Sequence, residues 1–229
     1  MPELASSFDD AWARFQALDG LRLRGDTLEW EWSRGRAQWL TFLARVEDAG
    51  PRDYLRGLTE RLAGIPGVET YPDWYWHVTI KGIGFQVIKR TRDDEVLRER
   101  VSSIVRAARD VIASRPAFEI QLRQPSGFPE VVFVEVHDRG AVRALNEALC
   151  NGLDVPRYPI DGAAFLPHIS VARFESNEGL AELKATLGEL RGGGPGPAFP
   201  VRRVELIRAW LTDEMPEFET LSAYQLAAP

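Results

Sequence analysis

Apolar residues recur three or four positions apart in several stretches of the chain, as they do on the buried face of an amphipathic helix. In the first stretch Phe8, Trp12 and Phe15 follow this spacing. The longest stretch ends before Pro116, which cannot continue a helix. The spacing predicts helices over residues 7–18, 51–62, 93–114, 142–149 and 179–190.

Other stretches alternate apolar and polar residues or are continuously apolar, which is the pattern of β-strands. Leu28, Trp30 and Trp32 alternate with polar residues, and the polar turn SRGR leads into the apolar run AQWLTFLARV. The pattern predicts strands over residues 27–32, 37–46, 77–85, 118–124, 131–137, 165–174, 201–211 and 219–227. It also predicts a loop at PSGFPE (residues 125–130) and a loop or linker at GGGPGP (residues 192–197).

The chain resembles itself when it is shifted by 91 residues. At this offset His77 falls on His168, and Thr79 falls on Ser170. The other matches are Phe42 with Phe133, Leu43 with Val134, Glu47 with Asp138, Leu58 with Leu149, Leu62 with Leu153, Val78 with Ile169 and Ile80 with Val171. The order strand, helix, histidine-containing strand therefore occurs twice, which predicts two related lobes that pack as one body.

The composition is that of an ordinary soluble globular protein, with 229 residues, 45% of them hydrophobic and 27% charged. The net charge of −6 argues against tight binding to long nucleic acid, where phosphate neutralisation supplies most of the affinity. Cys150 is the single cysteine, which fits a reducing compartment. The N-terminus lacks a signal-peptide pattern, and no apolar run approaches the roughly 20 residues of a membrane helix. We therefore expect a cytoplasmic protein that does not bind membranes and is a monomer.

Two of the three histidines lie in the motif His-x-Ser/Thr, each within an apolar strand pattern. Residues two apart in a strand share a face, so His77, Thr79 and Lys81 are predicted to point one way, and His168 and Ser170 likewise. If both faces line one cleft, two imidazoles and two hydroxyls surround a common space. Imidazole exchanges a proton near neutral pH, so this set suits acid/base cleavage of a phosphoester.

The two motifs resemble the signatures of the two-histidine (2H) phosphoesterase superfamily, in particular its branch of RNA 2′,3′-cyclic phosphodiesterases, also called 2′-5′ RNA ligases. The resemblance rests on His77-Val78-Thr79-Ile80-Lys81 followed by Gly84, and on the segment Pro167 to Arg173. It extends from about Gln38 to Leu226. Departures from the family pattern are Ser170 in place of a commoner threonine, the pair Gly82-Ile83, and the N-terminal extension.

The resemblance implies an α+β fold that is bilobal and pseudo-duplicated, with two antiparallel sheets lining a central groove and helices outside. Residues 37–229 would form this single domain, and residues 1–36 an N-terminal extension. It further implies that no metal or other cofactor is used. His77 would protonate the leaving oxygen, His168 would act as the base on water, and Thr79 and Ser170 would bind the phosphate.

Other residues near the motifs are weaker candidates. Lys81 is a candidate phosphate contact, and Trp74 and Phe128 are candidates for stacking a nucleobase. Arg173 falls on the face opposite His168 by alternation, so only a bend or bulge would bring it into the cleft. His137 has no hydroxyl residue two positions on, and we expect it to be structural or exposed.

The favoured function is therefore a metal-independent phosphodiesterase that hydrolyses a 2′,3′-cyclic phosphate, a related cyclic phosphate or a 2′-5′ linkage in a small nucleotide or RNA end. Ligation would be the reverse reaction. A protein of the same fold that only binds a nucleoside monophosphate is the first alternative, and an interaction protein without nucleotide affinity is the second.

Overall fold

The computed structural model describes residues 5–23, 32–211 and 215–228. Ten strands form one sheet in the order β10-β9-β1-β3-β7-β6-β5-β8, with β2 paired to β7 and β4 paired to β3. The strands are β1 (Gln38–Arg45), β2 (Val68–Thr70), β3 (His77–Val87), β4 (Glu95–Leu97), β5 (Phe118–Phe128), β6 (Val131–His137), β7 (His168–Phe174), β8 (Ala198–Val201), β9 (Arg203–Trp210) and β10 (Glu217–Gln225).

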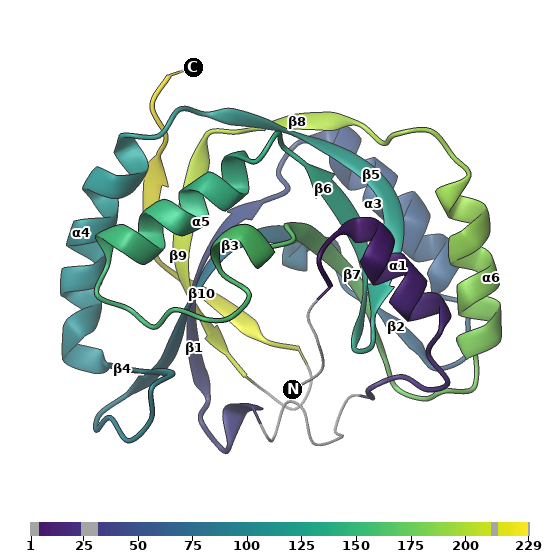
Figure 1. Cartoon of the computed structure of the whole chain (residues 1–229), viewed down its shortest axis with the longest axis horizontal. Helices are drawn as coiled ribbons and strands as arrows, with labels where there is room; N and C mark the ends of the chain where they lie inside the picture. The colour runs from purple at the N-terminus through teal and green to yellow at the C-terminus, as the bar shows by residue number, and fades with distance from the viewer. Residues whose placement is uncertain (1–4, 24–31, 212–214, 229) are drawn as a thin grey trace.

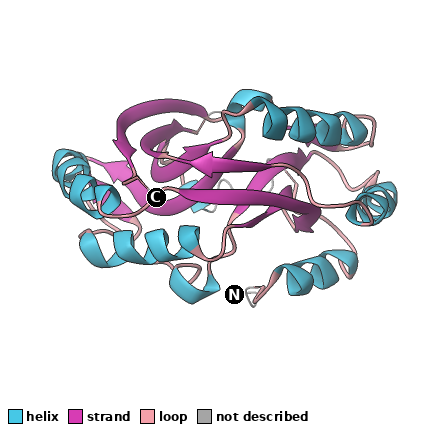
Figure 2. Cartoon of the chain, turned by 90° about the horizontal axis from the view of Figure 1, so that it is seen from above, coloured by secondary structure: helices cyan, strands magenta, loops and turns pink. Residues whose placement is uncertain are grey.

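The described helices lie around this sheet (Figures 1 and 2). They are α1 (Phe8–Gln16), α3 (Ala49–Leu62), α4 (Val101–Ala113), α5 (Ala141–Gly152) and α6 (Leu180–Arg191), with short 3-10 turns η1 (Asp73–Tyr75), η2 (Arg98–Arg100) and η3 (Gly162–Ala164). Helix α5 contacts β3, α4 contacts β10, α3 contacts β7 and α6 contacts β5. Their apolar stripes and the sheet share one core cluster, because each element must bury its apolar face against another.

The mixed fold of helices and antiparallel strands agrees with the expected fold class, and the duplicated order strand, helix, strand is present. In the first copy β1 pairs antiparallel with β3, and in the second β6 pairs antiparallel with β7. The two expected sheets are joined into one path, because β3 and β7 pair at Val78 and Ile169, the middle residues of the two motifs. We call β10, β9, β1 and β3 the first lobe, and β7, β6, β5 and β8 the second.

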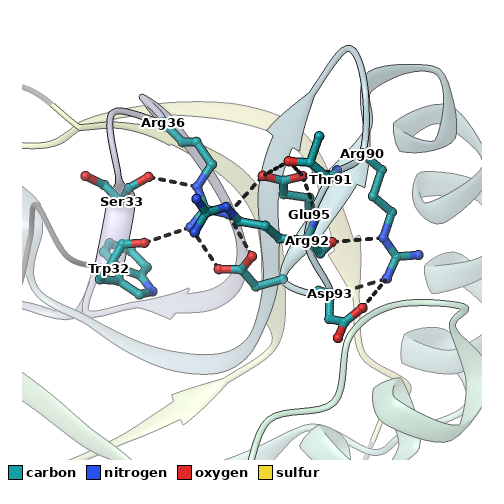
Figure 3. A network of polar contacts seen from close by, with 9 residues as sticks. Trp32, Ser33, Arg36, Arg90, Thr91, Arg92, Asp93 and Glu95 are labelled. Carbon is teal, nitrogen blue, oxygen red and sulfur yellow. Dashed lines mark hydrogen bonds and ion pairs between the residues drawn. The ribbon is translucent and has the colours of Figure 1, made fainter.

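The helix predicted over residues 93–114 begins later than its apolar spacing indicates. Residues 95–97 form strand β4 beside β3, and the α-helix begins at Val101. Figure 3 shows the cause: the buried Glu95 carboxylate accepts hydrogen bonds from the backbone amides of Thr91 and Arg92 and from Arg36. This turn holds the chain extended, so the tertiary contacts override the local helical preference.

The predicted loop at residues 125–130 is also shorter than expected. Strand β5 continues to Phe128, and its pairing with β6 is interrupted by a register shift between Leu122 and Pro125. Pro125 lacks a backbone N–H, so a bulge is where a strand tolerates it. The predicted strand over residues 27–32 lies outside the described residues except for Trp32, which belongs to a short helical turn. No helix in the described ranges combines the length and apolar character that crossing a membrane requires.

Candidate active site

The paired motif strands bring four of the predicted site residues onto one face of the sheet. Val78 and Ile169 are fully buried in the core, whereas the residues on either side of each are partly exposed. Antiparallel pairing at Val78 and Ile169 sets His77 beside Ser170 and Thr79 beside His168. We call this surface the histidine face. It presents two imidazoles and two hydroxyls on neighbouring strands.

Both imidazoles are oriented by the same backbone contact. His77 Nδ1 lies 2.5 Å from the carbonyl oxygen of Tyr75, and His168 Nδ1 lies 2.8 Å from that of Leu166. A carbonyl oxygen only accepts, so Nδ1 carries the proton and donates in each ring. The Nε2 atom of each neutral ring is thereby left as the proton acceptor, which is the arrangement that acid/base catalysis needs.

Burial disfavours the charged form of both rings. It lowers the pKa of His77 from its usual 6.5 to about 4, and the positive charges of Arg45 and His168 add to this effect, while the hydrogen bond to Tyr75 opposes it. Burial also lowers the pKa of His168, opposed by the hydrogen bond to Leu166. Both imidazoles are therefore neutral at neutral pH until an anion approaches them.

Aromatic rings surround each histidine. Tyr75 and Phe218 have ring centroids 5.2 and 5.4 Å from His77, and Trp74 packs edge-on against Phe218 at 6.0 Å with 47% of its surface exposed. Phe128 lies edge-on to His168 at 5.3 Å. Of the two candidates for base stacking, Trp74 thus lies at the rim near His77, and Phe128 beside His168.

The prediction that Lys81 shares the face of His77 and Thr79 is wrong. On β1, Leu43 pairs with Thr79 but its neighbour Phe42 pairs with Lys81, so Ile80 is an extra residue that forms a β-bulge. A bulge reverses the alternation beyond it. The Lys81 side chain points into the core.

The Lys81 ammonium group is bound by partners in the core. Its Nζ donates to the Asp161 carboxylate at 2.7 Å and to the Pro156 carbonyl at 2.8 Å, and lies 4.5 Å from the centre of the Tyr158 ring. The side chains of Lys81 and Asp161 are 0% and 1% exposed. Lys81 is therefore not placed to contact a phosphate on the histidine face.

The second motif contains the matching bulge. Val132 pairs with Ala172, but Phe133 pairs with Ser170, so Val171 is the extra residue. Beyond this bulge Arg173 lies on the same face of the sheet as His168. Strand alternation alone predicted the opposite face. Its Nε donates to Glu69 at 2.5 Å, and its guanidinium lies 5.9 Å from the centre of the Tyr71 ring.

Sequence reasoning missed two residues next to His77. Arg45 is the strand partner of His77 on β1, and it donates to Glu205 at 3.0 Å and to the Trp74 carbonyl. Phe218, on β10, covers the His77 ring but lies 141 positions along the chain, and no motif marks it. Arg45 lies two residues after the centre of an apolar strand, which gave a weak indication that it could lie near the site. Nothing in the sequence around Phe218 predicted its contact with His77.

The third histidine lies away from these four residues. His137 is about half exposed, its Nε2 lies 3.5 Å from Glu135, and its ring stacks on Phe8 at 5.4 Å. Within the described ranges, no group of three or more histidine, cysteine, aspartate or glutamate residues is arranged to hold a metal ion.

Comparisons with known proteins identify the family and the fold. The family model described as the 2′-5′ RNA ligase superfamily matches residues 51–210. A search of curated proteins gave no match. Among solved structures, TT0787 of Thermus thermophilus is similar with 18% identity over 82% of this chain and 97% of its own, at a TM-score of 0.61. E. coli LigT complexed with 3′-AMP is similar with 15% identity over 84% and 99%, at a TM-score of 0.56. At these identities the likeness shows the shared fold.

Proposed function

This chain belongs to the 2′-5′ RNA ligase superfamily, and on that premise we propose that it is a phosphodiesterase that hydrolyses the 2′,3′-cyclic phosphate of a small nucleotide or RNA end. A related cyclic phosphate or a 2′-5′ linkage is the same class of substrate, and ligation is the reverse reaction. One observation carries the proposal. The paired strands set two imidazoles, each with its Nδ1 fixed on a backbone carbonyl, on one face beside two hydroxyls.

In the proposed reaction one imidazole acts as a base and the other as an acid. His168 Nε2 takes a proton from water as the water oxygen bonds to phosphorus, and His77 protonates the ribose oxygen as its bond to phosphorus breaks. Opening of the ring at the 3′ oxygen leaves a 2′-phosphate. The hydroxyls of Thr79 and Ser170 donate to the non-bridging phosphate oxygens, where charge develops.

Substrate binding favours the protonated form of His77, with the proton taken up from solvent. In the unliganded protein burial keeps the pKa of His77 at about 4, so the imidazole is neutral near pH 7. A phosphate anion between the two rings favours the charged imidazole and raises its pKa. The acid is thus formed when the substrate binds, and a proton on His77 disfavours one on His168, which acts as the base, because the two charged rings would repel each other.

Several features support a small nucleotide or an RNA end as the substrate. Trp74 lies on the His77 side of the phosphate site and Phe128 on the His168 side, so each is a candidate to contact a nucleobase on its own side, an interaction worth about 1–3 kcal/mol in single-strand binders. A net charge of −6 favours a small nucleotide or an RNA end over a long duplex. The single cysteine, Cys150, fits a reducing compartment such as the cytoplasm.

The test is hydrolysis of nucleoside 2′,3′-cyclic phosphates and 2′-5′ dinucleotides with a chelator present. We expect turnover to persist with the chelator and to yield the 2′-phosphate. His77→Ala and His168→Ala should each lower kcat by roughly 10²–10⁴. Lys89→Ala, a change at an exposed residue, is the control and should leave kcat unchanged. Activity that disappears with the chelator and returns with a divalent ion contradicts the mechanism.

The same assay separates hydrolysis from simple binding. If the wild-type protein binds a nucleoside monophosphate but hydrolyses none of the cyclic substrates, it is the non-catalytic binder of this fold. If it neither binds nor hydrolyses, the interaction protein remains. The presence of histidine in both motif copies favours catalysis.

A further inference from the structure

Helix α1 lies outside the residues that match the family model, and it packs on the histidine face of the second lobe (Figure 1). Phe133 is the strand partner of Ser170, so its side chain is on that face, with its ring 5.1 Å from His168. The Phe8 ring of α1 lies 6.2 Å from Phe133, and Ala11 of α1 joins Val131 and Phe133 in one apolar cluster.

The helix is fixed in this position at several points. Lys184 of α6 donates from Nζ to the carbonyls of Gln16 and Leu18, at 2.8 and 2.5 Å, which satisfies two acceptors at the helix C-terminus. The Leu21 amide donates to Asn177 at 2.6 Å. Phe15 is 1% exposed and its ring lies against Gly127 of β5. These contacts hold α1 against the second lobe, beside the histidine face.

A cavity of about 380 Å³ opens between the start of α1 and strands β5 and β6. Its lining residues are Ser7, Phe8 and Asp9 on one side and Gln124, Glu135, His137 and Arg191 on the other. Glu135 is the strand partner of His168, so the cavity begins one strand away from that histidine, roughly 5 Å along the sheet. Its volume falls within the roughly 300–1,000 Å³ of small-molecule pockets.

We propose that this cavity is the subsite for the nucleobase of the substrate whose phosphate lies at the two histidines. The inference rests on the proposed function and deepens it, because it names the part of the substrate that α1 recognises. In such a substrate the ribose links the phosphate to the base, and the cavity begins one strand away from His168. Base recognition would then be a property of this chain's own N-terminal segment.

The chemistry of the lining matches a flat heterocycle with polar edges. His137 stacks on Phe8 with an interplanar angle of 18° and is about half exposed, so one ring of this pair is open to further stacking. Gln124 makes no side-chain hydrogen bond among the residues that the structure describes, and its amide both donates and accepts. An amide of this kind suits the donor and acceptor edge of a nucleobase.

The charged residues of the cavity are held in place. Arg191 donates to Glu135 at 2.7 Å and to the Pro125 carbonyl at 2.9 Å, and its guanidinium lies 4.6 Å from the Trp12 ring of α1. Glu135 is buried and carries this ion pair, with His137 at 3.5 Å. Arg191 and Glu135 bind each other, so they form a fixed wall of the cavity. Selection of the base would then come from ring stacking and from the Gln124 amide.

The test compares two substrates that differ only in the base. One is adenosine 2′,3′-cyclic phosphate, and the other is 1,4-anhydroribitol 2,3-cyclic phosphate, in which a hydrogen replaces the base. For Phe8→Ala and Gln124→Ala we expect KM of the adenosine substrate to rise five-fold or more, and KM of the base-free substrate to change less than two-fold. Gln16→Ala, an exposed position on the same helix, is the control and should change neither. Circular dichroism and the melting temperature report whether each variant is folded.

The outcomes separate this inference from the proposed function. If the folded variants change both substrates equally, or change neither, the cavity does not hold the base and the inference fails while the phosphodiesterase proposal stands. If the wild-type protein hydrolyses neither of these nor any other nucleoside 2′,3′-cyclic phosphate or 2′-5′ dinucleotide, the proposed function fails. The inference is then decided by calorimetry with 3′-AMP and 1,4-anhydroribitol 3-phosphate. A loss of affinity in Phe8→Ala for 3′-AMP alone supports it, and equal or absent losses overturn it.

Discussion

The change Lys81→Met separates a buried ion pair from a phosphate contact. In the wild-type protein Lys81 and the Asp161 carboxylate form a fully buried pair, and Asn146 Nδ2 also donates to that carboxylate at 2.9 Å. Methionine matches the length of the lysine stem but removes the charge. Asp161 then keeps the hydrogen bonds from Asn146 Nδ2 and the Tyr158 amide, but loses the one from Lys81 together with its counter-ion. Breaking a buried pair by removing one partner costs about 3–5 kcal/mol.

The assay is urea unfolding of the wild type, Lys81→Met and the double variant Lys81→Met/Asp161→Asn. We expect the single variant to lose about 3–5 kcal/mol of unfolding free energy, and the double variant to lose less, because no unpaired charge remains in the core. The control Lys89→Met, at an exposed position, should change the unfolding free energy by less than about 0.5 kcal/mol.

Phosphate affinity provides the second measurement. Well below the unfolding transition, calorimetry with inorganic phosphate should give Lys81→Met an affinity within about two-fold of the wild type, since the ammonium group points away from the histidine face. A variant that keeps nearly all its stability but binds phosphate ten-fold more weakly would refute the reasoning. Lys81 would then reach the site despite the bulge.

Three further predictions concern His77 and the packing of α1 on Gly127. The pKa of His77 is about 4 in the free protein and rises beside a phosphate anion. In pH–rate profiles, the pH above which kcat decreases should therefore be higher than the pH above which kcat/KM decreases. If the two decreases coincide, the prediction is wrong. The folded protein holds His77 neutral below its unfolded pKa of 6.5, so protonation favours the unfolded state and stability falls as pH drops from 6.5 to about 4. His77→Phe should remove about 3 kcal/mol of that fall in urea titrations, and an unchanged pH dependence argues against it. In Gly127→Ala the added methyl group clashes with the Phe15 ring, so the unfolding free energy should decrease by about 1–3 kcal/mol. Limited proteolysis should also cleave the N-terminal segment faster than in the wild type. An unaltered cleavage rate shows that other contacts hold α1.

Strand alternation predicted the faces of four site residues because it needs only local information. Trp76, Val78 and Ile80 are buried, and His77 and Thr79 between them are partly exposed, as the sequence pattern indicates. The 91-residue offset also has a direct structural counterpart, since the two motif strands pair with each other.

The errors arise where pairing with distant segments decides the outcome. The bulge at Ile80 exists because of how β1 pairs with β3, and nothing within the motif distinguishes it from a regular strand. The amphipathic pattern of residues 7–18 predicts a helix, but not which surface that helix covers. Its place on the histidine face depends on contacts with Gly127, Asn177 and Lys184, more than one hundred residues away.

The pairing of Val78 with Ile169 gives the duplicated strands an approximate two-fold axis that runs between their middle residues. In the proposed reaction, displacement at phosphorus brings one oxygen in on one side and expels another on the opposite side, so two groups that transfer protons are needed, related by a half-turn. Either lobe alone has only one imidazole for this task. The proposed chemistry therefore depends on both lobes, since each motif strand contributes one imidazole to the histidine face, and the covalent chain keeps the two strands paired at any protein concentration.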